Sequence, residues 1–167
     1  MSRRRPSRRL ATALAALSMG IGGLSHGGVF GDGPQRQELD VAPPASLDFD
    51  SAEPFEMPGD QRLEFAVIAS SINIHEDGLI RYVLVATSPS GGQNVLFETL
   101  DCKRQESKTT SRWSSHTQQW TPVDRARWIG LKASRNSANR VLAQGIFCLN
   151  GLNRASVAVM RQELKRQ

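Results

Sequence analysis

A nine-residue stretch with apolar side chains on both faces limits the folds open to this chain of 167 residues. In residues 79–87, LIRYVLVAT, alternate positions place Ile80, Tyr82, Leu84 and Ala86 on one side. The other side carries mostly aliphatic residues as well. A strand that is apolar on both faces is typical of the centre of a sheet. We therefore predict a central β-strand here.

Turn sequences on either side of this strand predict antiparallel neighbours. Residues 88–94, SPSGGQN, have the composition of a hairpin loop, and residues 95–100 then alternate in strand fashion. Before the central strand, residues 75–78, HEDG, predict a turn in which Gly78 adopts a positive φ at little cost. The apolar run LEFAVI at 63–68 predicts a further strand. Short turns between successive strands indicate an antiparallel sheet.

The second half of the chain predicts one more hairpin and short helices. The polar stretch 105–120 is expected to form a solvent-facing hairpin that turns near residues 114–116, and TPVD at 121–124 could begin a helix or be only a turn. Ser137 and the following ANRVLAQ predict a short helix that Gly145 ends. A last helix is predicted from about Ala155, with three apolar side chains on one stripe. These are Val157, Met160 and Leu164.

The first 27 residues have the pattern of a secretory signal peptide. Five arginines stand within the first nine residues, and the uncharged residues 10–24, LATALAALSMGIGGL, follow them. This apolar run is shorter than the roughly 20 residues that span a bilayer, so we expect no transmembrane segment after cleavage. We expect export to the periplasm, by the general or the twin-arginine route, with cleavage after Ser18, Ser25 or Gly27.

The same arginines account for the net charge of +5. Without them the 21 Lys and Arg fall to 16, which equals the 16 Asp and Glu. A mature chain near neutrality lacks the basic excess that is typical of nucleic-acid binding. We therefore expect no nucleic-acid partner.

An acidic, proline-rich lead-in is predicted at residues 28–60, before a domain at 61–167. The lead-in holds five prolines and eight acids against one base, Arg36, whereas the domain carries 15 basic and 8 acidic residues. We expect an extended linker that is only weakly attracted to the domain, because exposed charges are screened. Four apolar side chains of the lead-in could dock locally. These are Leu47, Phe49, Phe55 and Met57.

Cys102 and Cys148 are the only two cysteines, and both follow the predicted signal peptide. In an oxidising compartment a disulfide is the favoured interpretation. Closing a loop of about 47 residues would stabilise the fold by roughly 4 kcal/mol in the chain-entropy model. The alternative makes Cys102 a nucleophile with His75 or His116 as its base, but there is no C-x-x-C, and neighbouring Asp101 would raise the thiol pKa.

Other groups that could carry chemistry give weaker signals. His75, Glu76 and Asp77 are possible metal ligands, yet three consecutive residues of a tight turn cannot all point at one ion, so we expect a solvated turn, no metal and no cofactor. Three tryptophans fall in the polar region. Two are expected in the core and one on the surface, where it could meet a partner or a sugar. The core pair is Trp120 and Trp128, and the surface candidate is Trp113.

The ordered motifs of the central hairpin resemble a known family. An Asp-Gly turn, Arg81-Tyr82, Ser90-Gly91 with Asn94, and Glu98 followed by Cys102 stand in the order of the cryptic neisserial protein (CNP-like) family of bacterial envelope proteins. Two later features are similar to the family's second half, so the resemblance covers roughly residues 60–150. They are the pair Trp120 and Trp128, and Phe147-Cys148. The resemblance implies an exported protein of Gram-negative bacteria with no established activity.

These observations predict a single α+β domain with a central antiparallel sheet, short helices in its C-terminal part and one disulfide. The leading functional hypothesis is a non-catalytic binding or assembly module, with an unknown envelope protein or a small ligand as partner. Its possible binding surface is Arg81, Tyr82, Glu98, Trp113 and Trp120. A hydrolase-like enzyme that uses Arg81, Glu98 and His75 is the alternative. A purely structural envelope protein is the third possibility.

Overall fold

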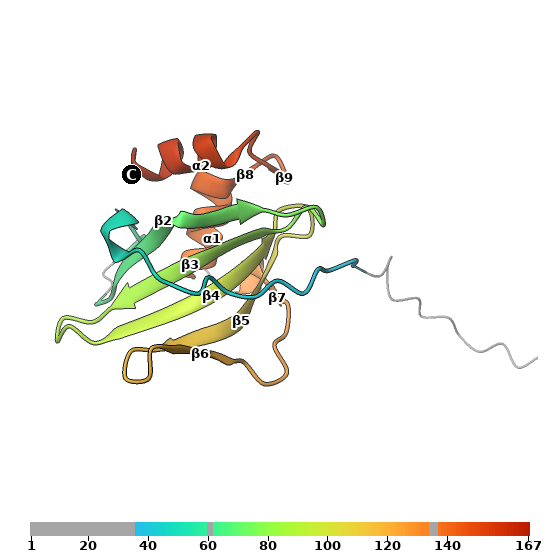
Figure 1. Ribbon diagram of the computed structural model, residues 1–167. Coiled ribbons are helices and arrows are strands. Elements are labelled where there is room, and N and C mark those ends of the chain that lie inside the picture. The colour runs from blue at the N-terminus through green and yellow to red at the C-terminus, as the bar shows by residue number, and fades with distance from the viewer. Residues whose placement is uncertain (1–35, 60–61, 134–136) are drawn as a thin grey trace, which may run out of the picture. The chain divides into compact units, whose positions relative to one another are not determined.

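The computed structural model describes residues 36–59, 62–133 and 137–167 (Figure 1). The predicted signal peptide, residues 1–27, and the beginning of the lead-in lie outside the described residues. Residues 36–167 form one compact unit.

An antiparallel sheet dominates this unit, and its strands neighbour each other in chain order. The path runs through β1 (Ala52–Phe55), β2 (Glu64–Ile74), β3 (Ile80–Thr87), β4 (Gln93–Asp101), β5 (Glu106–Ser114) and β6 (Gln119–Pro122). The short β7 (Ile129–Gly130) pairs with the other end of β5. The strand predicted to be central is β3, which is hydrogen-bonded to β2 and β4 and buried along nearly all its length. The prediction of a central antiparallel sheet is confirmed.

The turns between the strands form where they were predicted. Gly78 has a φ of +74° and Gly91 a φ of +81°, and both N–H groups bond back three residues to close their turns. The hairpin of β5 and β6 turns over residues 115–118, close to the predicted place. No helix begins at 121–124, because Thr121 and Pro122 end β6 and pair with β5.

Short helices follow the sheet, as predicted. After a 3-10 turn, η2 (Leu131–Ala133), come α1 (Ala138–Val141), a π-helical turn η3 (Leu142–Phe147) and α2 (Val157–Leu164); the hairpin of β8 (Cys148–Leu149) and β9 (Leu152–Asn153) precedes α2. The hydroxyls of Ser137 and Ser156 accept capping bonds at the two α-helices. The prediction that Gly145 ends the first helix is wrong. The helical segment continues through the π-helical turn to Phe147, because Ile146 and Phe147 bury their side chains completely.

Among the described residues, no helix is both long and apolar enough to cross a membrane.

The helices cover one face of the sheet and build the larger core (Figure 1). Tyr82 of β3 packs against Phe147 with ring centroids 4.8 Å apart. The predicted stripe of α2 is placed correctly, since Met160 and Leu164 are buried there and Val157 packs against them. The predicted disulfide is confirmed: Cys102, next to the end of β4, is bonded to Cys148 of β8, and both lie in this core.

The opposite face of the sheet is covered by residues 36–51, which we call the strap. In Figure 1 the strap runs in front of β3 and β4, whereas α1 lies behind them. Val41 and Leu47 of the strap pack against a second, smaller core. That core consists of Ile68, Val83, Val85, Val95 and Phe97, with Ala52, Trp113 and Trp120 at its margin. The structure thus differs from the expectation of a loosely attached linker, because β3 and β4 have apolar residues on this face that need cover.

Candidate functional site

A buried ion pair on β3 and its preceding turn fixes the strap to the sheet. Asp77 and Arg81 have side chains that are only 2% and 3% exposed, and their charged groups lie 2.7 Å apart. Asp77 accepts a hydrogen bond from the main-chain N–H of Leu39, and Arg81 donates one to the carbonyl of the same residue. Both main-chain polar groups of Leu39 are therefore bound by one pair of side chains, independently of the leucine side chain.

The environment of Asp77 keeps its carboxylate ionised. Burial opposes ionisation, but the hydrogen bonds from Arg81, from the main chain of Leu39 and Leu79, and the positive charge of Arg81 outweigh it and lower the pKa of Asp77 to about 2. His75 in the same turn has a lowered pKa, because burial and the charge of Arg81 disfavour its protonated form. The turn expected to be solvated thus carries the strap's main anchor.

A second anchor holds the first described residue of the strap. The guanidinium of Arg36 pairs with Asp101 at 3.1 Å and with Glu106, and it lies 3.4 Å above the ring centroid of Trp128. Trp128 was expected in the core, but it belongs to neither apolar cluster. Its ring instead lies under the guanidinium of Arg36. The only base of the acidic lead-in therefore pairs with two acids of the domain.

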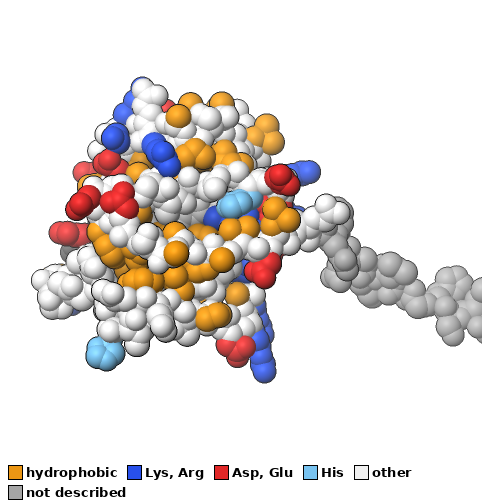
Figure 2. Space-filling model, in the orientation of Figure 1, with side chains coloured by type: hydrophobic (Ala, Val, Ile, Leu, Met, Phe, Trp, Pro, Cys, Tyr) orange, Lys and Arg blue, Asp and Glu red, His pale blue; other side chains and the backbone are white. Residues whose placement is uncertain are grey.

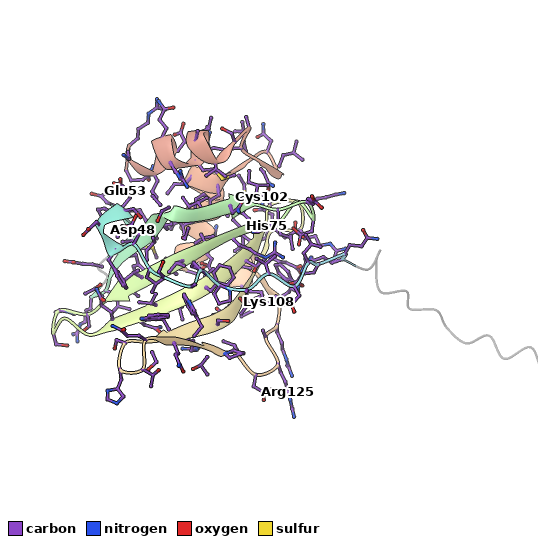
Figure 3. All side chains as sticks on the ribbon, viewed as in Figure 1. Asp48, Glu53, His75, Cys102, Lys108 and Arg125 are labelled. Carbon is purple, nitrogen blue, oxygen red and sulfur yellow. A yellow bond between two sulfur atoms is a disulfide. The ribbon has the colours of Figure 1, made fainter. Side chains whose placement is uncertain are left out.

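Two more contacts secure the strap along its length. Lys108 of β5 forms an ion pair with Glu38 (Lys108 is labelled in Figure 3). The indole N–H of Trp120 donates to the carbonyl of Pro44 at 2.8 Å. Trp120 also packs against the smaller core, which matches the expectation for this residue. The strap is thus bound by side chains of the turn before β3 and of β3, β4, β5 and β6.

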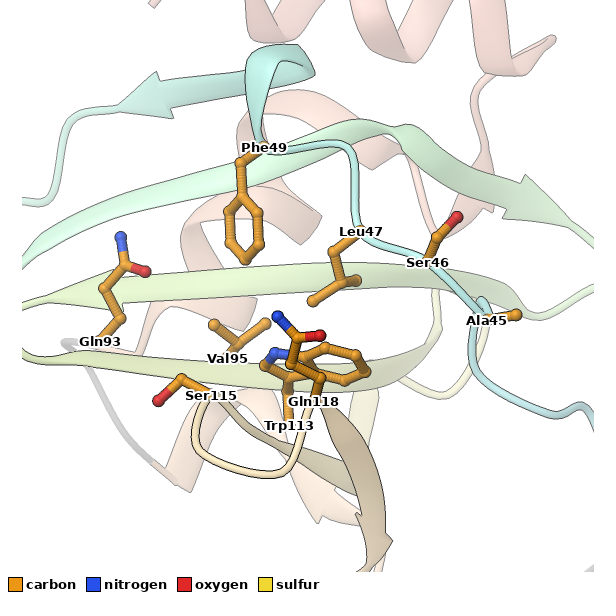
Figure 4. Close-up of a pocket in the computed structure, with 9 residues that line it drawn as sticks. All are labelled: Ala45, Ser46, Leu47, Phe49, Gln93, Val95, Trp113, Ser115 and Gln118. Carbon is orange, nitrogen blue, oxygen red and sulfur yellow. The ribbon is translucent and has the colours of Figure 1, made fainter.

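An open pocket of about 480 Å³ lies between the strap and the β4–β5 part of the sheet. Figure 4 shows Phe49 and Leu47 projecting from the strap toward Val95 and Trp113 on the strands. Polar but uncharged side chains complete the lining. The whole lining, apolar and polar, consists of Ala45, Ser46, Leu47, Phe49, Gln93, Val95, Trp113, Ser115 and Gln118. In the space-filling view hydrophobic side chains gather on the face that the strap crosses (Figure 2).

The aromatic wall of this pocket is held in place from behind. Trp113 contacts Trp120 edge to face, with ring centroids 5.3 Å apart, and Trp120 in turn contacts Phe97 at 6.1 Å. Because Trp120 is also bonded to Pro44 of the strap, the indole of Trp113 rests on a fixed partner. The surface candidate Trp113 therefore lines a preformed concavity.

On the helix side, Tyr82 and Glu98 enter a buried hydrogen-bond network around Asn139. The hydroxyl of Tyr82 donates to the Asn139 Oδ1 at 2.9 Å, and the Asn139 amide donates to Glu98 and to Ser107. Thr109 donates to the other oxygen of Glu98 at 2.7 Å. These bonds tie α1 to β3, β4 and β5.

Burial disturbs the titration of both acids in this network. Desolvation raises the pKa of Glu98, although hydrogen bonds from Thr109 and Asn139 and the charge of Arg112 oppose the shift. Burial, with the nearby charge of Glu98, raises the pKa of Tyr82 well above its usual value. The phenol therefore remains a neutral hydrogen-bond donor.

The raised pKa of Glu98 predicts that the stability difference between the wild type and Glu98→Gln depends on pH. A raised pKa in the folded state stabilises the fold below the unfolded pKa, and this contribution is lost as pH rises. Glu98→Gln should therefore gain stability relative to the wild type between about pH 4 and 7. Glu98→Ala should lose about 1–3 kcal/mol because the Asn139 amide loses an acceptor. Urea unfolding at both pH values measures these differences, and a pH-independent gap between wild type and Glu98→Gln would contradict the argument.

The structure separates the residues that the sequence grouped into one surface. Arg81, Tyr82 and Glu98 are at most 2% exposed, and Arg81 points to the strap whereas Tyr82 and Glu98 point to the helices. Arg81 is opposite Thr99 in the sheet register, so it forms no cross-strand pair with Glu98. The alternative hydrolase grouping of Arg81, Glu98 and His75 thus does not converge on one pocket.

Two other candidates from the sequence were a cysteine nucleophile and a metal site. Cys102 is 1% exposed and disulfide-bonded, so it is not a thiolate nucleophile in this structure. Within the described ranges no cluster of three His, Cys, Asp or Glu residues could hold a metal ion.

Sequence reasoning missed the strap anchors, although two signals for them exist. One is the single base, Arg36, within an acidic segment. The other is the four-residue spacing of Asp77 and Arg81 around a turn that leads into a buried strand. A charged residue in a buried strand requires a partner. The nearest acid before Arg81 was therefore a candidate for it.

Comparison with known proteins agrees with the fold's extent. The model of the CNP1-like family matches residues 32–165. No curated protein and no solved structure matches the chain. The matched region begins before Arg36, so it includes the strap together with the sheet and the helices.

Proposed function

Because the chain belongs to the CNP1-like family, and because its strap and sheet form a preformed pocket, we propose that it is an exported, envelope-associated binding module without catalytic activity. The observation that carries this proposal is the uncharged pocket built around Trp113. Concave sites with aromatic walls and a few polar groups are the usual form of ligand sites.

The construction of the pocket supports a binding role. Its walls come from the strap, from β4 and from the β5–β6 hairpin, and each of these is fixed by contacts outside the pocket. A preformed site loses little conformational entropy when a ligand binds. An aromatic ring such as that of Phe49, which is 43% exposed, offers apolar area to a ligand.

The sequence pattern and the disulfide support the export half of the proposal. The basic residues, the apolar run and the small residues that follow match a cleaved signal peptide. The disulfide between Cys102 and Cys148 suits an oxidising compartment. Each of the three candidate cleavage positions precedes Arg36, so processing would leave the whole strap in the mature chain.

Export is tested by the intact mass of the protein purified from the envelope fraction, with and without reduction and alkylation. We expect the loss of roughly the first 18–27 residues, as for an ordinary signal peptide, and no free thiol before reduction. An uncleaved chain with two alkylatable thiols would overturn the export proposal.

Binding is tested by placing a photo-crosslinking amino acid at Gln93, which lines the pocket, in cells that express the full chain. The matched control carries the same amino acid at Gln162, an exposed position on α2. We expect a discrete adduct from position 93 that is absent from position 162 and lost when Trp113→Ala is added. Equal labelling from both positions, or none, would contradict a binding site at this pocket.

A further inference from the structure

We propose that the pocket between the strap and the sheet binds an uncharged carbohydrate, with a sugar ring stacked on the indole of Trp113. This inference rests on the proposed binding function and names the ligand class of the same site. Four observations carry it: the charge of the lining, its chemical mixture, the position of Gln118 and the pairing of the strands beneath.

Among the residues that the structure describes, the lining of the pocket carries no ionisable group. All nine lining residues are neutral, although 22% of the chain is charged. An anionic or cationic ligand would leave its hydration shell without gaining a counter-charge from these residues, which is costly. A neutral ligand avoids this cost.

The chemical mixture of the lining fits a ring that is apolar on its face and polar on its edge. A pyranose has C–H groups on its faces and hydroxyls around its rim. The indole of Trp113 offers a flat apolar surface, and the amides of Gln93 and Gln118 can both donate and accept hydrogen bonds. The hydroxyls of Ser46 and Ser115 add two more such groups. Together they provide a platform and a surrounding set of partners for sugar hydroxyls.

Gln118 occupies a backbone conformation that favours glycine. Its φ is +50°, in the left-handed region, which L-amino acids with a side chain adopt only at a cost in free energy. The position is exposed and lines the pocket. Glycine would relieve the backbone cost but would remove the amide, so the residue present supplies a polar group to the pocket at the expense of turn stability.

The strands beneath the pocket favour a sugar over a peptide. β4, which carries Val95, is paired with β3 on one side and β5 on the other. The part of β5 that carries Trp113 is paired with β4 and β6. An extended peptide that binds by main-chain pairing needs a free strand edge. Neither strand offers one at the pocket floor, so recognition there depends on side chains.

The test is calorimetric titration of the full chain with three uncharged tetrasaccharides, built from N-acetylglucosamine, from β-1,4-linked glucose and from α-1,4-linked glucose. We expect at least one to bind with a Kd of about 1 mM or lower. Trp113→Ala and Gln118→Gly should each weaken that binding about tenfold or more, which corresponds to a loss of about 1.4 kcal/mol. His116→Ala, two residues away in the same turn but outside the lining, is the matched control and should bind as the wild type does.

Gln118→Gly keeps the test decisive even if Trp113→Ala fails to fold, because glycine suits the backbone at this position. Absence of binding by all three sugars would overturn the carbohydrate assignment, as would equal affinity for an acidic uronic-acid tetramer. Tighter binding of a proline-rich peptide with the same variant pattern would assign the pocket to peptides instead. The proposed function fails separately, when the crosslinker at Gln93 yields no specific adduct.

Discussion

Asp77→Asn should destabilise the protein by about 2–3 kcal/mol at neutral pH, since it leaves the guanidinium of Arg81 buried without its counter-charge. The substitution nearly preserves the shape of the side chain, so it tests the charge and not the packing. It also weakens the acceptor for the Leu39 N–H, which is the strap's contact with this turn. Equilibrium unfolding in guanidinium chloride measures the loss.

The matched control for this change is Asp124→Asn. Asp124 and its neighbour Arg125 have side chains that are 94% and 83% exposed (Arg125 is labelled in Figure 3), so the control should change stability by less than about 0.5 kcal/mol. Losses of similar size in the two variants would show that burial of the Asp77–Arg81 pair is not what matters.

The same pair predicts how stability depends on acid pH. The folded-state pKa of Asp77 is about 2, below the usual 3.8. A lowered pKa contributes stability that is present above the unfolded pKa and is lost as pH falls through the folded one. The wild type should therefore lose about 2 kcal/mol from this group between pH 4 and pH 2. Asp77→Asn lacks this contribution, so the gap between the two proteins should narrow over that interval, and a constant gap would contradict the assigned pKa.

Reduction of the Cys102–Cys148 disulfide should lower the free energy of unfolding by about 4 kcal/mol, because the bond connects residues 46 positions apart and restricts the unfolded chain. Both cysteines belong to the larger core, between the helices and the sheet. Comparing oxidised with reduced wild type changes no residue, so the difference isolates the crosslink. A double substitution to alanine should lose at least as much, since it also removes buried atoms.

Guanidinium unfolding with and without reductant measures this effect. The control is the double alanine variant, whose stability should not respond to reductant. A loss below about 1 kcal/mol on reduction of the wild type would mean that the helices hold to the sheet without the crosslink.

Much of the sheet could be predicted because its signals are local. The two-residue alternation in 79–87 and the glycines of the flanking turns each indicate a specific feature without knowledge of distant residues. The disulfide could be predicted for another reason, since two cysteines allow only one pairing. The capping hydroxyls of Ser137 and Ser156 likewise stand next to the helices that they begin. The predicted end of the first helical segment was wrong, because the burial of Phe147 outweighed the low helix propensity of Gly145.

The candidate site was predictable only in part. Trp113 was singled out as an unusual aromatic, and it does line the pocket. Arg81 and Glu98 stand in strands, and the alternation of each strand predicts the face on which the side chain lies. The alternation does not predict which residues the side chain contacts on that face. A β-bulge at Thr110 shifts the register of β5, and it brings Thr109 opposite Glu98. Such a shift leaves no clear pattern in a single sequence.

The sequence by itself determined the antiparallel sheet and the C-terminal helices, because alternation, turn chemistry and capping act between residues close in the chain. It also determined the disulfide, because a chain with two cysteines allows only one intramolecular pairing. Only the tertiary structure decided that an acidic, proline-rich segment becomes the strap across the sheet. That outcome depends on Leu39 meeting Asp77 and Arg81, and on Arg36 meeting Asp101, contacts that span about 40 and 65 residues of chain. The composition of the segment predicted a solvated linker. Its packing against the smaller core and its hydrogen bonds to the buried Asp77–Arg81 pair instead offset the entropy cost of ordering it.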